Sequence, residues 1–113
     1  MNFPIVLVRF SEIALKSKRT RATLKRMLSR NMLIRLRMAK LSFDRIEDTW
    51  DRLILYTDES ERAAGALSTV FGVVSTSPAV ECEAEIDNIV RIVRDLACEK
   101  LRQGNTFAIC VRR

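Results

Sequence analysis

Histidine is absent from this 113-residue chain, and glycine, proline and cysteine are scarce, with three, two and three residues. The missing imidazole removes the side chain that most often acts as a general base near neutral pH. The few glycines form neither GxxxxGK[ST] nor GxGxxG nucleotide-binding loops, and no serine lies in a nucleophile elbow. We therefore expect none of these common catalytic devices in this chain.

The three cysteines, Cys82, Cys98 and Cys110, lie far apart and form no CxxC pair. Without histidine, this spacing argues against a zinc site, and the odd count argues against a disulfide framework. Each cysteine has apolar residues within two positions in the sequence, so we expect reduced, buried thiols. Alternating acids in residues 81–87 are better explained as a solvated strand edge and helix start than as metal ligands.

Long apolar runs are also missing from the sequence. No run approaches the ~18 residues that a membrane span needs. The opening segment, MNFPIVLV, lacks the basic leader and the small-residue cleavage site of a signal peptide. We therefore expect a cytoplasmic protein with no membrane partner.

Acidic residues are absent from Ile13 to Phe43, where ten lysines and arginines occur. Residues 1–43 carry a net charge of +10, whereas residues 44–113 carry −4. Like charges four residues apart on a helix repel, and Arg26 and Arg30 form such a pair, as do Arg21 and Lys25. Arginine fits phosphate oxygens well, so the pattern favours a folded RNA partner bound through its backbone and shape. The alternative is an ordinary solvated helix face.

Hydrophobic periodicity predicts an α+β fold with the order βαββαβ, followed by an additional helix and strand. The expected strands are residues 4–10, 40–46, 52–57 and 73–80, with a last strand at 106–113; the expected helices are residues 20–38, 58–72 and 85–104. The first six elements predict a ferredoxin-like unit, a four-stranded antiparallel sheet with both helices on one face. The last two elements cannot bury a sheet of their own. If they begin an incomplete domain, residues 86–111 should expose apolar surface.

The faces of the helix at residues 20–38 are assigned at 100° per residue. The expected apolar side contains Leu24, Met27, Leu28, Ile34 and Met38. The expected outer side contains Arg19, Arg26, Arg30 and Arg37. Arg35 lies near the apolar side, so we expect either that its charged end extends outward or that the helix is irregular there.

Three segments of the chain resemble the tRNA 4-thiouridine synthetases, also called tRNA sulfurtransferases or thiamine-biosynthesis sulfur-transfer proteins. VRFSEIALKSKRTR, residues 8–21, resembles the opening of that family, although Ser11 and Ser17 stand where glycines are expected. VFGVVSTSPAVECEAEID, residues 70–87, resembles the hinge between its first two domains, and TFAICVRR, residues 106–113, resembles an arginine-ending strand of its THUMP domain.

The resemblance implies an N-terminal ferredoxin-like domain over residues 1–81 and the first helix and strand of an incomplete THUMP-like domain over residues 82–113. In that family, these domains grip the acceptor end of tRNA. A later PP-loop domain uses ATP and Mg²⁺ to adenylate the uridine, and sulfur is delivered through cysteine. This chain has no Ser-Gly-Gly-x-Asp-Ser loop. We therefore expect a tRNA-binding front end with no metal or cofactor of its own and no activity alone.

Charge pattern and resemblance together give the expected RNA-binding residues: Lys16, Lys18, Arg19, Arg21, Lys25, Arg26, Arg30, Arg37, Arg112 and Arg113. Glu12 is expected to organise the loop through an ion pair with Lys16, and the alternative is a direct functional contact. Three alternatives stay open at this point. One is the RNA-binding module of another THUMP protein that takes part in tRNA methylation or acetylation. The others are a self-contained ferredoxin-like homodimer with a solvated basic face, and a small acyl-phosphate hydrolase.

Overall fold

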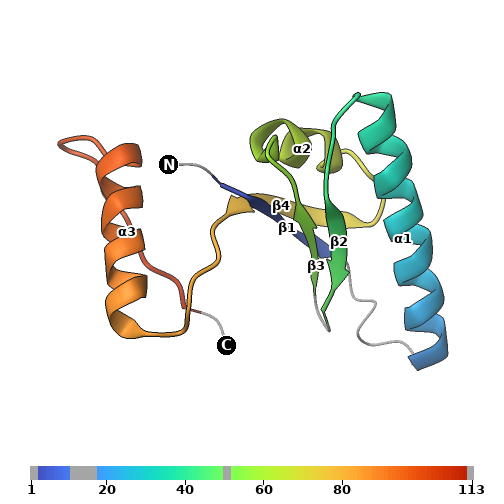
Figure 1. Cartoon of the computed structure of the whole chain (residues 1–113), viewed down its shortest axis with the longest axis horizontal. Helices are drawn as coiled ribbons and strands as arrows, with labels where there is room; N and C mark the ends of the chain where they lie inside the picture. Colours follow the sequence, from blue (N-terminus) through green and yellow to red (C-terminus); the bar gives the residue numbers. More distant parts are fainter. Residues whose placement is uncertain (1–2, 11–17, 50–51, 112–113) are drawn as a thin grey trace. The chain divides into compact units, whose positions relative to one another are not determined.

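The computed structural model describes residues 3–10, 18–49 and 52–111. The chain divides into a first unit, residues 2–81, and a second unit, residues 82–113, which we describe separately. Figure 1 shows both units with their helices and strands labelled. No helix in the described ranges is long and apolar enough to cross a membrane.

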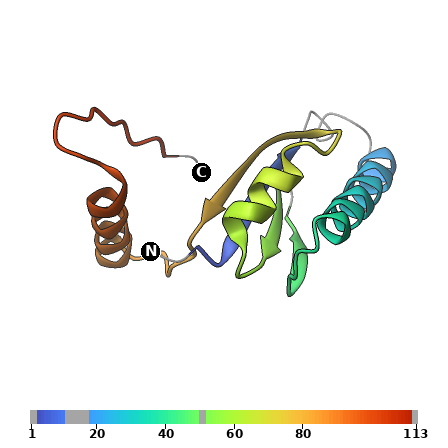
Figure 2. The same ribbon diagram turned by 90° about the horizontal axis from the view of Figure 1, so that it is seen from above.

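The first unit contains a four-stranded antiparallel sheet with the strand order β2-β3-β1-β4. Its strands are β1 (Ile5–Phe10), β2 (Arg45–Asp48), β3 (Arg52–Tyr56) and β4 (Val73–Ala79), and its helices are α1 (Lys18–Met38) and α2 (Ser60–Leu67). The element order is therefore βαββαβ, and the predicted ferredoxin-like architecture is confirmed. The two views in Figures 1 and 2 show the helices beside the sheet.

The core of the first unit lies between the two helices and one face of the sheet. Alternate residues of the central strands point into it, and both helices contribute to the same cluster. The cluster includes Val6 and Val8 from β1, Leu53 and Leu55 from β3, Leu28, Met32 and Leu36 from α1, and Ala63, Ala64 and Leu67 from α2. Since one continuous core joins both helices to the sheet, the opposite sheet face has no helix from this unit.

Some element boundaries differ from those predicted. The strand expected at residues 40–46 begins only at Arg45, because α1 first ends in a left-handed turn at Lys40, where φ is 56°. The amide of Leu41 donates to the carbonyl oxygen of Leu36 at 3.0 Å and closes this turn. α2 ends at Leu67, and Gly72, with φ 95°, lies in the turn before β4.

The second unit contains α3 (Ile86–Lys100), which has no buried residue. Residues 101–111 form no strand, so the strand predicted at 106–113 is wrong over its described part. A strand needs a partner for its backbone groups, and the second unit offers none among its described residues. Cys82, Cys98 and Cys110 are free but exposed, which corrects the prediction of buried thiols.

Candidate nucleic-acid interface

The outer face of α1 carries a stripe formed by Arg19, Arg26, Arg30 and Arg37, which we call the arginine stripe. At 3.6 residues per turn these four positions fall within about 40° of one another, and they extend over roughly 27 Å of helix. All four side chains are exposed, as predicted. None of them makes a hydrogen bond or an ion pair with a residue in the described part of the chain.

The start of α1 is unusually basic. Its first turn contains no acidic residue, and three basic residues, Lys18, Arg19 and Arg21, lie at this end of the helix. The positive end of a helix dipole disfavours nearby cations and favours anions. Placing positive side chains there therefore raises the local potential instead of neutralising it, which suits a negatively charged ligand.

Lys25 has a different environment from the arginine stripe and is 8% exposed. Its ammonium donates to Asp48 Oδ1 at 2.8 Å and to the carbonyl oxygen of Thr49 at 2.7 Å. It also lies 5.4 Å from the centre of the Phe10 ring. Lys25 therefore fixes α1 to the end of the sheet, and the structure removes it from the set of surface contacts expected from the sequence. The reason is that its charge is already paired inside the unit.

The buried side of α1 is centred on Leu28, Met32 and Leu36, which are 0–4% exposed. The predicted apolar side was wrong for Met27, Ile34 and Met38, which are 47–69% exposed. The buried face of α1 was hard to identify from the sequence because two inward-facing residues have long, positively charged side chains. Lys25 is one of them, and Arg35 is another, because its Nε donates to the carbonyl oxygen of Ala66 in α2 at 3.4 Å. The charged end of Arg35 therefore lies beside α2.

Several predicted site residues cannot be placed on this surface. Glu12, Lys16, Arg112 and Arg113 lie outside the described residues, and so does the side chain of Lys18. Arg21 is partly buried at the edge of the α1 face.

Three further basic residues, Arg9, Arg45 and Arg52, lie on the sheet and were not among the predicted contacts. Arg9 is on β1, and its cross-strand partner on β3 is Arg52. The alternation of the strand 4–10 could have placed Arg9 on the face opposite Val6 and Val8. The pairing with Arg52 could not be found without the register of the sheet.

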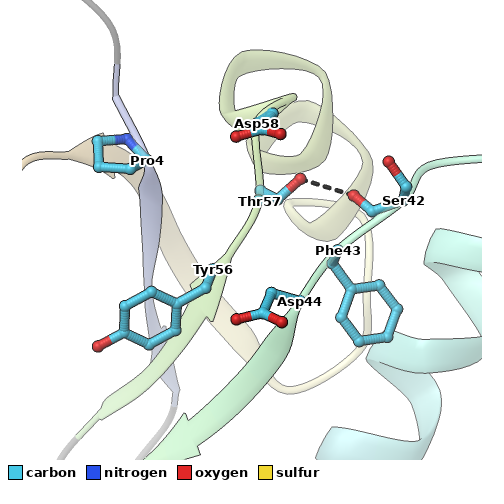
Figure 3. A pocket seen from close by; sticks show the side chains of 7 residues that line it. All are labelled: Pro4, Ser42, Phe43, Asp44, Tyr56, Thr57 and Asp58. Atoms are coloured by element: carbon cyan, nitrogen blue, oxygen red, sulfur yellow. Dashed lines mark hydrogen bonds between the residues drawn. The ribbon is translucent and has the colours of Figure 1, made fainter.

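A shallow pocket of about 430 Å³ opens near the ends of β1 and β3 (Figure 3). Its lining includes Pro4, Phe43 and Tyr56 with two carboxylates, Asp44 and Asp58. The Thr57 hydroxyl donates to the carbonyl oxygen of Ser42 at 2.7 Å and so joins two residues of the pocket lining (Figure 3). Two carboxylates make the pocket unfavourable for phosphate.

Next to the pocket, Tyr56 is held by charged neighbours. Its hydroxyl donates to Glu47 Oε2 at 2.9 Å, and the Arg45 guanidinium lies 3.8 Å from the ring centre. Hydrogen bonds to Glu81 and Glu47 raise the pKa of Tyr56 to about 12, because both stabilise the protonated phenol. Within the described ranges, no group of three or more His, Cys, Asp and Glu side chains is arranged to hold a metal ion.

Comparison with known proteins gives consistent matches. Residues 5–77 match the family described as "ThiI ferredoxin-like domain". The chain is 35% identical over 109 residues to the "Probable tRNA sulfurtransferase" of Methanosarcina acetivorans, which covers 96% of this chain and 26% of that protein. It is 33% identical over 115 residues to the "Probable tRNA sulfurtransferase" of Thermococcus kodakarensis, with 98% and 30% covered.

A solved structure also resembles this chain. The crystal structure of PH1313 from Pyrococcus horikoshii matches with a TM-score of 0.74 and 35% sequence identity, over 90% of this chain and 34% of that one. This chain therefore spans about a quarter to a third of the length of the proteins that it matches.

Proposed function

The chain belongs to the ThiI ferredoxin-like domain family, and on that premise we propose that it is the tRNA-binding front end of a tRNA 4-thiouridine synthetase and is not catalytic by itself. The family match confirms the resemblance seen in the sequence. The curated relatives named above are tRNA sulfurtransferases, which supports tRNA as the partner. The observation that carries the proposal is the arginine stripe of α1, whose four side chains are exposed and whose guanidinium groups make no hydrogen bond or ion pair with any described residue.

The arginine stripe would bind by phosphate neutralisation. Each guanidinium offers several N–H donors in a plane, which suits two oxygens of one phosphate. Neutralising phosphates releases condensed cations, so affinity comes from the backbone and falls as salt rises. Such contacts position a nucleic acid without reading its sequence. Selection of tRNA would then depend on its shape and on other parts of a longer protein.

The second unit is proposed to be the start of a THUMP-like domain. The exposed apolar stripe of α3 supports this, because Ile86, Ile89, Val90 and Val93 are 41–75% exposed. Such a stripe is expected where a helix normally packs against further structure. Arg112 and Arg113 would add RNA contacts at the end of this unit, and Lys16 and Lys18 would add them before and at the start of α1.

The chemistry of sulfur transfer is assigned to other domains of the longer family members. ATP and Mg²⁺ would bind there, and the link to thiamine biosynthesis would belong to the whole protein. We place the protein in the cytoplasm, where its proposed tRNA substrate occurs. A homodimer would be visible by light scattering with and without tRNA.

The proposal is tested by filter retention of tRNA with the full chain and its charge variants. Arg26→Gln combined with Arg30→Gln should weaken binding by about tenfold or more at moderate salt, since two phosphate contacts are lost. The matched control is Arg91→Gln combined with Arg94→Gln, which removes the same charge from exposed positions of α3. Wild-type affinity in the α1 variant, or an equal loss in both variants, would contradict the proposal.

Competitors separate tRNA recognition from general attraction to polyanions. Duplex DNA and heparin are added at equal phosphate or sulfate concentration. Under the proposal, both should displace tRNA less effectively than unlabelled tRNA does. Equal displacement by all three would show that the positive charge is generic.

A further inference from the structure

The turn between α2 and β4 presents an aromatic ring to solvent. Phe71 is 95% exposed, and no other large apolar side chain in the described part of the chain is as exposed. Its neighbours in the turn are used differently, because Val70 is 9% exposed and Val73 packs against the core cluster. The ring therefore adds almost nothing to the apolar burial that stabilises the fold.

The backbone that carries Phe71 is fixed on both sides. The amide of Val70 donates to the carbonyl oxygen of the last residue of α2 at 3.1 Å, and the amide of Val73 donates to the carbonyl oxygen of Val70 at 3.1 Å. Gly72 has φ 95°, a conformation that glycine adopts without strain. A Cβ atom on Gly72 would lie 3.6 Å from Leu28 Cδ1, so the turn lies against α1. Phe71 is thus held on an anchored turn beside α1.

The flank of α1 that faces this turn is apolar and leads to the arginine stripe. Lys25 reaches the end of β2, and Arg35 reaches a carbonyl oxygen of α2. On the helical wheel, Arg35 lies between Lys25 and Met27, about 80° from each, so Met27 is on the α2 flank. Met27 is 56% exposed and lies three residues before Arg30, which makes the two side chains neighbours on the helix surface.

We propose that the Phe71 ring stacks on an unpaired base of the RNA whose phosphates lie along the arginine stripe, with Met27 in contact with the same nucleotide. The inference rests on the proposed RNA-binding function and extends it from the phosphate backbone to a base. An RNA nucleotide has both an apolar base face and an anionic phosphate, which matches an exposed ring beside exposed arginines.

The chemistry of this contact is tolerant of sequence. Folded RNA offers unstacked bases in its loops, bulges and ends, and these bases commonly stack on aromatic side chains. Every base has a π face, so a phenylalanine ring accepts any of the four. A phenylalanine side chain has only two rotatable bonds, and its anchored backbone further reduces the entropy lost on binding.

The test uses the full chain and measures tRNA retention. Phe71→Ala should lower the affinity by about fivefold or more, because a stacked base is lost. Phe71→Leu keeps an apolar side chain without a ring and should also weaken binding, whereas Phe71→Tyr keeps the ring and should bind as the wild type does. The control is Ile86→Ala, which removes a 75% exposed apolar side chain from the second unit and should leave the affinity unchanged.

The salt dependence separates stacking from phosphate contacts. The Phe71 ring carries no charge and releases no condensed cations, so Phe71→Ala should lower the affinity by the same factor at every salt concentration. Arg26→Gln combined with Arg30→Gln should instead reduce the slope of log affinity against log salt. A reduced slope in Phe71→Ala would contradict stacking.

An RNA variant tests the base directly. Two RNA duplexes carry an unpaired extension of equal length, and in one of them the extension consists of abasic nucleotides, which keep every phosphate. The wild type should prefer the extension with bases by about fivefold or more, and Phe71→Ala should bind both duplexes equally. Equal binding of the two duplexes by the wild type would contradict the inference.

The failure of this inference is distinguishable from failure of the proposed function. Circular dichroism checks the fold of each variant. Wild-type affinity in Phe71→Ala, with weakened binding by Arg26→Gln/Arg30→Gln, would overturn the stacking contact alone. Wild-type affinity in Phe71→Leu would show that an apolar contact suffices and would overturn it too. Failure of the wild-type chain to bind tRNA would overturn the proposed function as well.

Discussion

The helices α1 and α3 each carry an apolar stripe but have very different surroundings. In α1, Leu28, Met32 and Leu36 are 0–4% exposed and lie in the core of the first unit. In α3, Ile86, Ile89, Val90 and Val93 are 41–75% exposed. An apolar stripe therefore predicts a helix and the face of that helix that packs against other residues. Whether that face is buried depends on which other elements of the protein pack against it.

The two helices also use their charges differently. The charged residues on the outer face of α1 are all basic, and the inward-facing Lys25 fixes the helix to the sheet. In α3, the acidic residues Asp87, Asp95 and Glu99 are interspersed with basic residues, and such a mixture of charges is usual for a solvated helix. One face of α1 packs in the core and the other carries the surface that we propose binds RNA, whereas α3 carries an apolar stripe that we propose packs against further structure.

The largest expected effect comes from removing core contacts in α1. Leu36→Ala should lower the free energy of unfolding by about 2–5 kcal/mol, because it leaves a cavity in a closed core. Ile89→Ala in α3 should cost less than about 1 kcal/mol, since that side chain already faces water. Urea unfolding followed by circular dichroism checks both values. Equal losses would contradict the difference in burial between the two helices.

Neighbouring residues of α1 should separate packing from binding. Lys25→Met removes the hydrogen bonds to Asp48 and Thr49, and should lower the free energy of unfolding by about 1–2 kcal/mol. The loss is moderate because the Asp48 side chain is 60% exposed and returns to water. Arg26→Gln should change stability by less than about 0.5 kcal/mol and weaken tRNA binding instead. A stability loss for Arg26→Gln as large as that for Lys25→Met would break this distinction.

The end of α1 offers a stabilising change. Lys40 adopts φ 56°, a conformation that costs an L-residue about 1–2 kcal/mol and glycine much less. Lys40→Gly should therefore raise the free energy of unfolding by about 0.5–1 kcal/mol after the extra entropy of the unfolded glycine is included. Lys40→Ala is the matched control, because it removes the charge and keeps the strain. Equal stabilities of the glycine and alanine variants would exclude the conformational explanation.

The smallest effect concerns Tyr56, which is the one tyrosine of the sequence and can be titrated by the ultraviolet absorbance of its phenolate. Its pKa of about 12 should fall toward 10 in Glu81→Gln, and less in Glu47→Gln. The raised pKa means that these hydrogen bonds stabilise the fold below pH 10, and that this contribution is lost as the pH rises toward 12. Glu85→Gln in the second unit is the control and should leave the titration unchanged. A titration midpoint of Tyr56 near pH 10 in the wild type would show that these hydrogen bonds do not form.

Most of the first unit could be predicted from the sequence because its signals are local. Residues 4–10 form a short apolar run rich in Val and Ile, which predicts a buried strand, and the outer positions of Arg26 and Arg30 follow from the helical period. The inward position of Lys25 could not be predicted, since it depends on Asp48 and Thr49, which β2 brings to the helix. The pair Arg9–Arg52 likewise requires the register of β1 with β3.

The second unit shows the limit of local signals more clearly. TFAICVRR has strand-forming residues, but a strand forms only where another strand can pair with it. Apolar neighbours in the sequence likewise suggested buried cysteines, and Cys98 and Cys110 are exposed because nothing among the described residues covers them.

The most direct test of the account is the salt dependence of tRNA affinity, measured in parallel for the wild type and for the two arginine-pair variants of α1 and α3. If the arginine stripe binds phosphates, Arg26→Gln/Arg30→Gln should reduce the slope of log affinity against log salt by about two. Arg91→Gln/Arg94→Gln should keep the wild-type slope. Equal slopes for all three proteins would contradict a phosphate-binding role of α1.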